Sequence, residues 1–467
     1  MEYKDAVGYL ESFVNYERTH QPDAMRAVRL DRMRRLCRAL GEPQRAFRAI
    51  LVTGTNGKGS ICAMLYAMLR RSALRVGLYT SPHLEHLRER VRVWDQGPDA
   101  PRQGHGDDWI TEPAFADLMT QMRPCLERMR SDVPGVSPTY FEILTALAFL
   151  AFSHRRVEVA VLEVGLGGRL DATNVVDQAV SVIAPIDVDH ADVLGESPAA
   201  IAREKAGVIK AGQTVITARQ LDEVAAVLQE TCEAHGVPLV MEGRDVTVGI
   251  SRCDLDGLEL SVSGLRGFYD GVRVPVVGRC QASNAALAVA ALEALSTRGI
   301  PHSLVERGLP EVAWPGRMEV VQTAPLVLLD GAHNAHATAA LAASLQELCR
   351  DRPLHLLVGM SADKSPEALG RQLGGLAASI TCTKSAHPRA LDPTELASRL
   401  APYGPEVHVM ADPLDAYTYV LNTVSPRAAI VVTGSLFLVG QLRSALRQAH
   451  VRSRKGALHA DGESGMA

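Results

Sequence analysis

Hydrophobic residues recur along the chain at two spacings, one typical of helices and one typical of buried strands. Leucine and methionine at three- and four-residue intervals over 30–40 predict that residues 1–46 are helical. A short hydrophobic run over 49–53 is followed by a glycine-rich turn, a helix over 58–71 and a strand over 75–80. Strand, helix and strand in this order predict a parallel βαβ unit.

The same alternation of strands and helices continues through the middle of the chain. The pattern predicts a long helix over 139–152 and strands over 157–163 and 179–186. Between 236 and 277, hydrophobic runs follow one another without a helix between them, which predicts a small antiparallel patch. A helix over 281–297 follows this patch.

Proline and glycine mark a domain boundary near 300–315, where Pro301, Pro310 and Pro315-Gly316 follow closely on one another. Beyond the boundary, a second α/β pattern has helices between predicted strands at 325–330, 354–359, 379–383, 406–410 and 428–433. Residues 450–467 are polar and contain glycine and serine, so we expect a disordered tail there.

Composition and charge exclude several classes of protein. The 467 residues are 47% hydrophobic and 22% charged, as in globular proteins. The formal net charge of −4 provides no basic field that would attract nucleic acid or an anionic membrane. The polar N-terminus lacks the hydrophobic core of a signal peptide, and no hydrophobic run is long enough to span a membrane. The eight cysteines form no C-x-x-C pair, which favours reduced thiols and a cytoplasmic location.

The strongest local motif is Val52-Thr-Gly-Thr-Asn-Gly-Lys-Gly-Ser60, in which a strand enters a glycine-rich turn that opens a helix. Such a turn presents backbone N–H groups and the positive end of the helix dipole to a phosphate. Lys58 can reach the β- and γ-phosphates of a nucleotide, and the Ser60 hydroxyl can bind Mg²⁺. The motif departs from G-x-x-x-x-G-K-[ST] because Gly59 separates Lys58 from Ser60. We interpret it as a nucleotide-binding turn; the alternative is a structural turn with a surface lysine.

Two strands of the same predicted sheet end in residues that can bind a metal. Glu163 closes a hydrophobic strand, and His190 follows the next strand along the chain. Ligands bind at the carboxyl ends of such strands, and Mg²⁺ takes oxygen ligands. Both residues are therefore candidates, although a carboxylate or a single histidine at this position can also be structural. By pattern alone, Lys205 is an ordinary lysine on a helix surface.

The second half of the chain repeats this arrangement of strand and turn. Asp330 ends a hydrophobic strand and His333 follows in the next turn, so both side chains can face one cleft. Arg317, just past the boundary prolines, can place its guanidinium on nucleotide phosphates, or it is a surface arginine at a domain junction.

Together these stretches resemble the Mur ligase superfamily, and within it the folylpolyglutamate synthase/dihydrofolate synthase family, from about Leu30 to Leu442. The matching motifs, in order, are Gly54-Thr-Asn-Gly-Lys-Gly-Ser60, Thr80-Ser-Pro-His-Leu84, Glu163-Val-Gly-Leu-Gly-Gly-Arg169, Asp189-His190, Glu204-Lys-Ala-Gly207, Asn284-Ala-Ala286 and Asp330-Gly-Ala-His-Asn334. Pattern and resemblance imply an α/β protein with two domains. Residues 1–308 would form a P-loop ATPase-type domain whose sheet is mostly parallel, with a small antiparallel patch, and residues 309–449 a Rossmann-like glutamate ligase domain.

The resemblance also implies which residues form the site. Contacts with ATP are expected of Asn56, Gly57, Lys58, Gly59, Ser60, Asn284, Arg317, Asp330 and His333. Binding of Mg²⁺ is expected of Ser60, Ser81, Glu163, His190 and, as a carbamate, Lys205. Contacts with the pterin-bearing substrate are expected of Leu30, Thr139, Phe141, Glu142, Leu170, Asp171 and Ala172. Lys58, Lys205 and His333 are the expected catalytic residues. Phe141 can stack on a pterin, and Asp171 can accept hydrogen bonds from its N–H groups.

The implied activity is the ATP- and Mg²⁺-dependent addition of L-glutamate to dihydropteroate, to folyl-(poly)glutamate, or to both, through an acyl phosphate. Two alternatives stay within the ligase class: a folylpolyglutamate synthase only, or a Mur-type ligase that uses a non-folate carboxylate. A third alternative is a P-loop NTPase or kinase without ligase activity. The segment around Lys205 and the pair Asp330 and His333 argue against it, because a simple kinase needs neither.

Departures from the family pattern concern the acceptor substrate rather than the phosphate chemistry. The segment Ala27-Val-Arg-Leu30 lacks the acidic residues usual there, and Asp363-Lys364-Ser365 replaces a more acidic Asp-Lys-Asp. Residues 95–108 form an insertion that we expect to be an exposed loop. We expect a monomer that acts on small molecules, because members of the family are usually monomeric.

Overall fold

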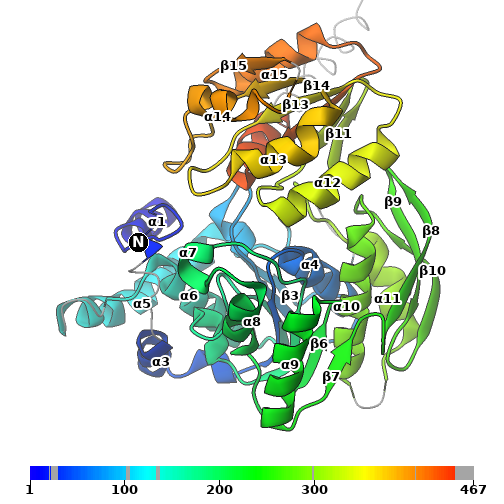
Figure 1. Ribbon diagram of the computed structural model, residues 1–467. Coiled ribbons are helices and arrows are strands. Elements are labelled where there is room, and N and C mark those ends of the chain that lie inside the picture. Colours follow the sequence, from blue (N-terminus) through cyan, green and yellow to red (C-terminus); the bar gives the residue numbers. More distant parts are fainter. Residues whose placement is uncertain are drawn as a thin grey trace, which may run out of the picture. The chain divides into compact units, whose positions relative to one another are not determined.

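The computed structural model describes residues 1–447, apart from residues 20, 23–29, 101–105, 133–136, 297–298 and 405. The chain divides into two compact units, the first Met1–Trp314 and the second beginning at Pro315 (Figure 1). Residues 27–29 of the acceptor segment, 101–105 of the predicted loop and 450–467 of the predicted tail lie outside the described residues.

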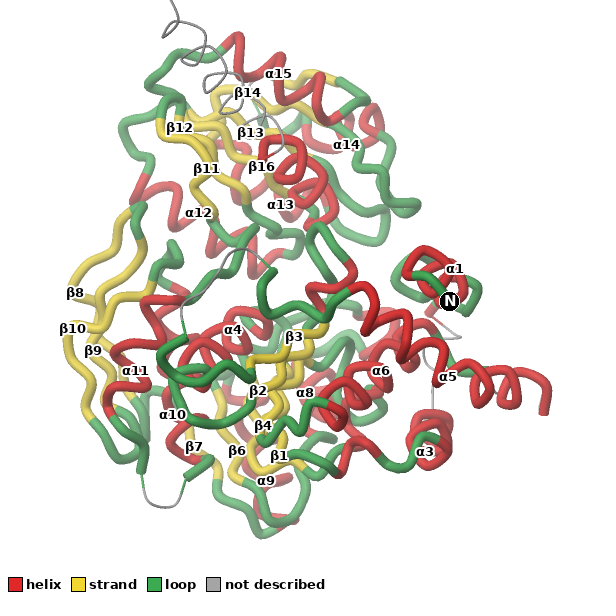
Figure 2. Tube along the Cα trace, turned by 180° about the vertical axis from the view of Figure 1, so that it is seen from behind, coloured by secondary structure: helices red, strands yellow, loops and turns green. Residues whose placement is uncertain are grey.

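The first unit is built on a seven-stranded sheet of order β3-β2-β4-β1-β5-β6-β7 (Figure 2). Its strands are β1 (Arg48–Thr53), β2 (Val76–Tyr79), β3 (Val91–Trp94), β4 (Val159–Glu163), β5 (Gln178–Ile183), β6 (Thr214–Thr217) and β7 (Leu239–Met241). All neighbouring strands are parallel except β2 and β3. The carboxyl ends of β2, β4, β1 and β5 therefore meet at one edge of the sheet.

Helices cover both faces of this sheet, which explains why its strands are mostly hydrophobic. Alternate residues of β1 point to opposite faces, so Ala49 and Leu51 join one core while Ile50 and Val52 join another. The first core is completed by α1 (Tyr3–Glu11), α3 (Leu30–Ala39), α5 (Glu112–Asp132), α6 (Tyr140–His154), α8 (Pro198–Ala206) and α9 (Asp222–His235). The second is completed by α4 (Lys58–Leu69), α10 (Cys280–Ala294) and α11 (His302–Gly308).

A three-stranded antiparallel sheet packs against the second core, as the sequence predicted. Its strands are β8 (Thr247–Asp254), β9 (Gly257–Ser263) and β10 (Phe268–Val274). Leu258, Leu260 and Val262 of β9 are buried in that core together with α10.

The second unit contains a six-stranded sheet of order β11-β12-β16-β13-β14-β15, parallel except between β11 and β12. Its strands are β11 (Glu319–Thr323), β12 (Leu326–Leu329), β13 (Leu354–Val358), β14 (Ala377–Cys382), β15 (Val407–Val409) and β16 (Ala429–Thr433). Its helices include α12 (Ala335–Leu348), α13 (Pro366–Leu373), α14 (Pro393–Leu400) and α15 (Pro413–Thr423), and residues 436–447 are also helical. Two α/β units with mostly parallel sheets confirm the predicted fold class.

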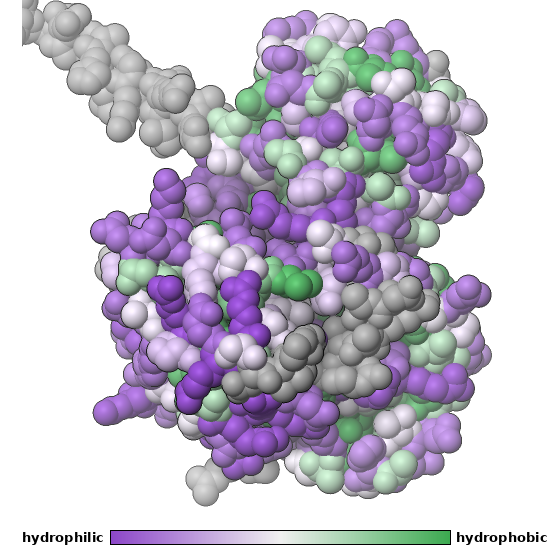
Figure 3. Space-filling view, turned by 90° about the vertical axis from the view of Figure 1, so that its left-hand side faces the viewer, coloured by the Kyte–Doolittle hydropathy of each residue, from purple (hydrophilic) through white to green (hydrophobic). Residues whose placement is uncertain are grey.

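Polar residues cover most of the molecular face shown in Figure 3, where hydrophobic residues gather only in small patches. Among the described residues, none of the helices combines the length and hydrophobicity that a membrane span requires. All eight cysteines are free thiols, and most are buried.

A buried carboxylate joins α10 to the turn between β9 and β10. Glu293, which is 1% exposed, accepts hydrogen bonds from the backbone N–H groups of Leu265, Arg266 and Gly267 and from the Tyr269 hydroxyl. Because one side chain satisfies all these donors, its removal leaves the buried Tyr269 hydroxyl and three partly buried N–H groups without this acceptor.

We expect Glu293→Ala to lower the free energy of unfolding by about 2–3 kcal/mol, because the buried Tyr269 hydroxyl and several partly buried N–H groups lose their acceptor. The measurement is urea-induced unfolding followed by circular dichroism. Glu230→Ala, on the exposed surface of α9, is the matched control and should leave the midpoint almost unchanged. Equal midpoints for the two variants would contradict the structural role of Glu293.

Candidate active site

The turn between β1 and α4 accepts only glycine at two positions. Gly54 and Gly57 have φ values of 139° and 88°, which side-chain-bearing residues rarely adopt. A Cβ atom on Gly54 would lie 2.6 Å from the Cβ of Ala184, and one on Gly57 would lie 2.5 Å from Oδ1 of Asn284. Asn284 of α10 therefore lies directly against the turn, although it follows the turn in sequence by more than two hundred residues.

Two lysine side chains converge on the same backbone carbonyl of this turn. The Lys58 ammonium donates to the carbonyl oxygens of Gly54 and Thr55, both at 3.0 Å, and the Lys205 ammonium donates to that of Gly54 at 2.8 Å. Lys205 is only 4% exposed, so its interpretation from pattern alone as a surface lysine is wrong. Burial, reinforced by the neighbouring charge of Lys58, lowers the pKa of Lys205 to about 7.

Two of the predicted metal ligands lie together at the carboxyl edge of the sheet. Glu163 ends β4, which lies between β2 and β1, and its Oε2 accepts a hydrogen bond of 3.0 Å from the backbone N–H of Ser81. The register pairs Glu163 with Val52, the residue two positions before Gly54. Ser60 is buried in the first turn of α4. This edge therefore holds a carboxylate and serine hydroxyls close to the glycine-rich turn.

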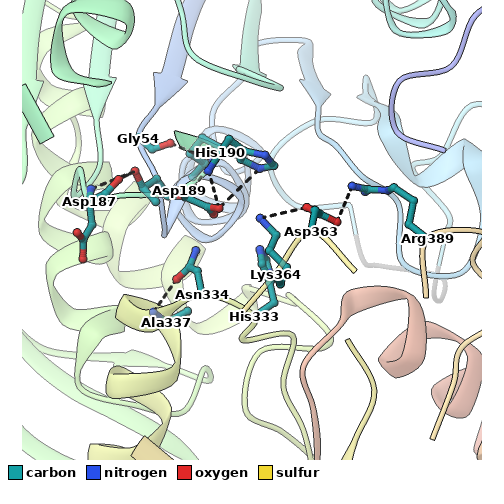
Figure 4. Close-up of polar contacts among 12 residues, drawn as sticks. Gly54, Asp187, Asp189, His190, His333, Asn334, Ala337, Asp363, Lys364 and Arg389 are labelled. Carbon is teal, nitrogen blue, oxygen red and sulfur yellow. Dashed lines mark hydrogen bonds and ion pairs between the residues drawn. The ribbon is translucent and has the colours of Figure 1, made fainter. Parts of the chain in front are cut away.

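The loop after β5 is tied to the same turn. The Thr55 hydroxyl donates to the carbonyl oxygen of Asp187 at 2.9 Å, and the N–H of Asp187 contacts the same hydroxyl at 3.1 Å. His190 has a φ of 52° and lies beside Asp189, whose Oδ1 accepts its backbone N–H at 2.9 Å (Figure 4). Positive φ is costly for a residue other than glycine and is concentrated at functional sites.

The donors at this edge fit Mg²⁺ better than a transition metal. Glu163, Ser60 and Ser81 offer hard oxygen atoms, which Mg²⁺ prefers together with water and phosphate oxygens. Within the described part of the chain, no cluster of three or more His, Cys, Asp or Glu side chains could hold a metal, as a zinc site would require.

The predicted acceptor residues at the start of α6 are held in a helix cap. The Thr139 hydroxyl accepts from the N–H of Glu142, and Glu142 Oε2 accepts from the N–H of Thr139 at 2.7 Å. Glu142 Oε1 also accepts from Arg32 Nε at 3.2 Å, which joins α6 to α3. Thr139 and Glu142 therefore have a structural role, whatever they contact in addition.

Phe141 and Asp171 flank the same glycine. A Cβ on Gly165 would lie 2.5 Å from Cζ of Phe141 and 3.2 Å from Oδ2 of Asp171. Asp171 is buried and accepts hydrogen bonds from the N–H groups of Gly165, Leu166 and Thr173 and from the Thr173 hydroxyl. Burial raises the pKa of Asp171, and these hydrogen bonds oppose the rise. These hydrogen bonds hold the loop after β4 around the carboxylate. A pterin N–H that binds Asp171 would have to share a carboxylate oxygen with one of these donors or displace that donor.

The other predicted acceptor residues surround this loop. Leu170 is half-buried and Ala172 is buried. Leu30 is buried at the start of α3, and that helix packs against the short 3-10 helix Ala172–Val175.

The predicted residues of the second unit gather where β12 ends and α12 begins. Asp330 is buried, and its oxygens accept from the N–H groups of Met318 and Ala332, each at 2.9 Å. Burial raises the pKa of Asp330, and the charge of Arg317 opposes this. His333 Nδ1 lies 2.7 Å from the carbonyl oxygen of Gly331.

Two further polar groups lie in the second unit (Figure 4). Asn334 caps α12 by accepting the N–H of Ala337 at 2.9 Å. Asp363 lies between two cations, 3.0 Å from Arg389 Nη1 and 3.8 Å from Lys364 Nζ.

Sequence reasoning missed Thr55 and Arg32 as parts of the site. Their partners Asp187 and Glu142 lie 132 and 110 residues away along the chain. A local sequence pattern does not indicate contacts between residues so far apart. The expectation that neighbouring strand ends lie together could have suggested the contact of Thr55 with Asp187, but not that of Arg32 with Glu142.

Comparisons with known proteins agree with this geometry. Residues 120–292 match the Mur ligase middle domain, and residues 316–436 match the Mur ligase glutamate ligase domain. The chain is 32% identical over 429 residues to a dihydrofolate synthase/folylpolyglutamate synthase of Bacillus subtilis, covering 90% of this chain and 95% of that protein. It is 32% identical over 450 residues to a folylpolyglutamate synthase of Lacticaseibacillus casei, covering 96% and 99% of the two chains. A solved structure of Mycobacterium tuberculosis folylpolyglutamate synthase complexed with ADP superimposes with a TM-score of 0.85 at 31% identity, covering 95% and 98%.

The lowered pKa of Lys205 predicts a pH-dependent stability. Between about 7 and the usual value of 10.5 the unfolded chain holds a proton that the folded chain has released, so stability rises with pH. Lys205→Met should therefore be more stable than the parent protein below pH 7, by on the order of 3 kcal/mol, and this difference should shrink toward pH 10. The measurement is urea unfolding in bicarbonate-free buffer, with Lys4→Met on exposed α1 as control. A difference that stays constant across pH would show that Lys205 keeps its ordinary pKa.

Proposed function

We propose that this chain, which belongs to the Mur ligase family and to its folylpolyglutamate synthase/dihydrofolate synthase branch, joins L-glutamate both to dihydropteroate and to folyl-(poly)glutamate. The reaction class is ATP-dependent amide ligation. The observation that carries the proposal is the turn over 54–60, where Lys58 and Lys205 concentrate positive charge beside the strand-end carboxylate of Glu163.

The positive charge at this turn lowers the main barrier to the reaction, which is the repulsion between negatively charged groups. A substrate carboxylate that attacks the γ-phosphorus of ATP is repelled by the phosphate oxygens. Lys58 and the backbone N–H groups from Asn56 to Ser60 neutralise this charge and hold the phosphates in line with the attacking carboxylate. Attack forms an acyl phosphate and releases ADP. The neutral amine of glutamate then attacks the acyl carbon, and phosphate leaves as the amide forms.

We assign Mg²⁺ to Ser60, Ser81, Glu163, His190 and a carbamylated Lys205. When bound, the ion would draw negative charge from the phosphate oxygens. A lysine reacts with carbon dioxide only as the neutral amine, and a pKa of about 7 supplies that form at neutral pH. The carbamate would also turn the repulsion between Lys205 and Lys58 into an attraction.

The remaining assignments follow the positions of the predicted residues. Asn284, which touches Gly57, is assigned to the nucleotide, as are Arg317 and Asp330 of the second unit. His333 is assigned to the departing phosphate or the incoming amine. The acceptor is assigned to the surroundings of Phe141 and Asp171, together with Leu30, Thr139, Glu142, Leu170 and Ala172. We propose a cytoplasmic monomer that binds neither nucleic acid nor membranes.

The identity of the acceptor substrate is the part of the proposal for which a specific alternative exists. The Bacillus subtilis relative carries both activities in its name, whereas the Lacticaseibacillus casei relative is named folylpolyglutamate synthase only. A folylpolyglutamate synthase without the first activity, or a ligase of a non-folate carboxylate, would use the same phosphate chemistry.

Phosphate release by the purified protein tests the proposal. With ATP and Mg²⁺, we expect release only when glutamate is offered together with dihydropteroate or a folyl-glutamate, and mass spectrometry should show the acceptor extended by one glutamyl residue. Lys58→Met should lower the rate by about 100-fold or more, because the phosphates lose a direct charge partner. Chelation of Mg²⁺ by EDTA should abolish the activity. Product from folyl-glutamate alone would restrict the enzyme to the second activity, and release driven by a hydroxyl acceptor would overturn the ligase assignment.

Chemical rescue tests the carbamate. Lys205→Ala should lose at least about 100-fold in activity, as expected for removal of a metal ligand, and acetate or propionate should restore part of it. Lys210→Ala is the matched control: Lys210 lies on the same segment and donates to the carbonyl oxygens of Asn174 and Val176, so a carboxylate should not rescue it. No rescue of Lys205→Ala at any carboxylate concentration would count against the carbamate.

A further inference from the structure

Arg90 is a buried arginine that none of the assignments above uses. It is 1% exposed and lies just before β3. Its Nη1 and Nη2 atoms donate to the two oxygens of Glu17 at 2.7 and 2.6 Å, and its Nε donates to Nδ1 of His83 at 3.0 Å. Burial would lower the pKa of Arg90, but the ion pair with Glu17 outweighs it and keeps the guanidinium charged. A buried ion pair of this kind is weak evidence for stability and is better explained by the geometry that it imposes.

Through Glu17, Arg90 binds the N-terminal segment that includes Val14. Glu17 belongs to the N-terminal segment that precedes α3, the helix that begins at Leu30. The same segment is fixed to α6, because the N–H of Tyr140 donates to the carbonyl oxygen of Val14 at 2.9 Å. The Tyr140 ring lies 5.7 Å from the Arg90 guanidinium, and its sequence neighbours are Thr139 and Phe141. Arg90 thus touches the start of α6, which carries the predicted acceptor contacts Thr139 and Phe141, and the N-terminal segment that is fixed to it.

Arg90 also holds the loop on the metal side of the site. Its backbone carbonyl accepts the N–H of Thr80 at 3.1 Å, and its side chain binds His83, so both ends of the loop around Ser81 are attached to one residue. An arginine has no acceptor, so Nδ1 of His83 must accept and its proton must sit on Nε2. Ser81 in turn donates its N–H to Glu163. A continuous set of contacts therefore runs from Glu17 through Arg90 to the strand-end carboxylate.

From these contacts we infer that Arg90 is a positioning residue for the acceptor carboxylate. It holds the N-terminal segment, the start of α6 and the loop over 80–84 in one arrangement, and so sets where the acceptor lies relative to Ser81 and Glu163. The inference rests on the proposed function for the identity of the acceptor. The nucleotide turn over 54–60 makes none of these contacts with Arg90 among the described residues, so loss of the arrangement should impair use of the acceptor more strongly than use of ATP.

Steady-state kinetics with each substrate varied in turn provide the test. Arg90→Lys keeps the charge but lacks the planar fork whose separate nitrogens bind both Glu17 oxygens and His83, and His83→Leu removes the acceptor. Both should raise the KM for dihydropteroate or folyl-glutamate by about 10-fold or more, because a small displacement of bound substrate is costly, while the KM for ATP changes by less than about 2-fold. His83→Asn keeps an acceptor near the Nδ1 position and should return the KM of the acceptor to within about 3-fold of the parent. The control is Arg71→Lys, which alters another partly buried ion pair of the first unit, with Glu311.

Equilibrium binding separates failure of this inference from failure of the proposed function. If the parent protein ligates neither acceptor, the proposed function fails, and the inference is then judged by the Kd values of ADP and of dihydropteroate measured by calorimetry. Selective loss of dihydropteroate binding in His83→Leu, reversed in His83→Asn, supports the positioning role. Equal losses for ADP and dihydropteroate, the same effect in Arg71→Lys, or no difference between the two His83 variants would overturn it. If Arg90→Lys does not fold, the His83 pair alone decides.

Discussion

The carbonyl oxygen of Gly54 accepts hydrogen bonds from two ammonium groups, and the rest of the site depends on this shared acceptor. Burial and the neighbouring charge of Lys58 lower the pKa of Lys205 to about 7, and the two lysines together concentrate positive charge at the turn. The turn can hold this arrangement only because glycine at 54 allows close approach to Ala184. The backbone conformation that requires glycine at 54 thus allows two lysines to meet at one carbonyl, and the resulting positive charge suits a polyphosphate.

The strand order of the first sheet brings the remaining groups to that turn. Strands β2, β4, β1 and β5 are neighbours, so the segments that follow them carry Ser81, Glu163, the turn itself and Asp187 to one edge. Parallel strands place all their carboxyl ends on the same side of the sheet. The connecting helices cover the two faces of the sheet, so this edge is where such sheets bind ligands. Arg90, which directly precedes the antiparallel strand β3, lies beside this edge and is not itself a predicted ligand.

Much of this could be predicted from the sequence where the signal was local. The alternation of hydrophobic runs predicted both α/β units, and the glycine-rich motif predicted the turn after β1 that opens a helix. Burial of Lys205 could not be predicted, because its helical segment carries no sign that a distant carbonyl would receive its ammonium. The four hydrogen bonds to Asp171 and the contacts of Arg90 were missed for the same reason: they are tertiary, and neither periodicity nor turn chemistry encodes them. Edge strand β3 was missed because arginine interrupts its hydrophobic pattern.

Asp171, Arg90 and Lys205, three of the buried charged side chains of the first unit, differ in how their charge is balanced. Asp171 has four hydrogen-bond donors, and Arg90 has a carboxylate and an imidazole. Lys205, among the described residues, has a carbonyl oxygen as its hydrogen-bond acceptor and a second lysine as its neighbour. The first two groups are matched within the fold and therefore serve to hold its shape. Lys205 makes no hydrogen bond to an anion among the described residues, so the carbamate proposed above would place a negative charge where the fold has left a buried amine of lowered pKa.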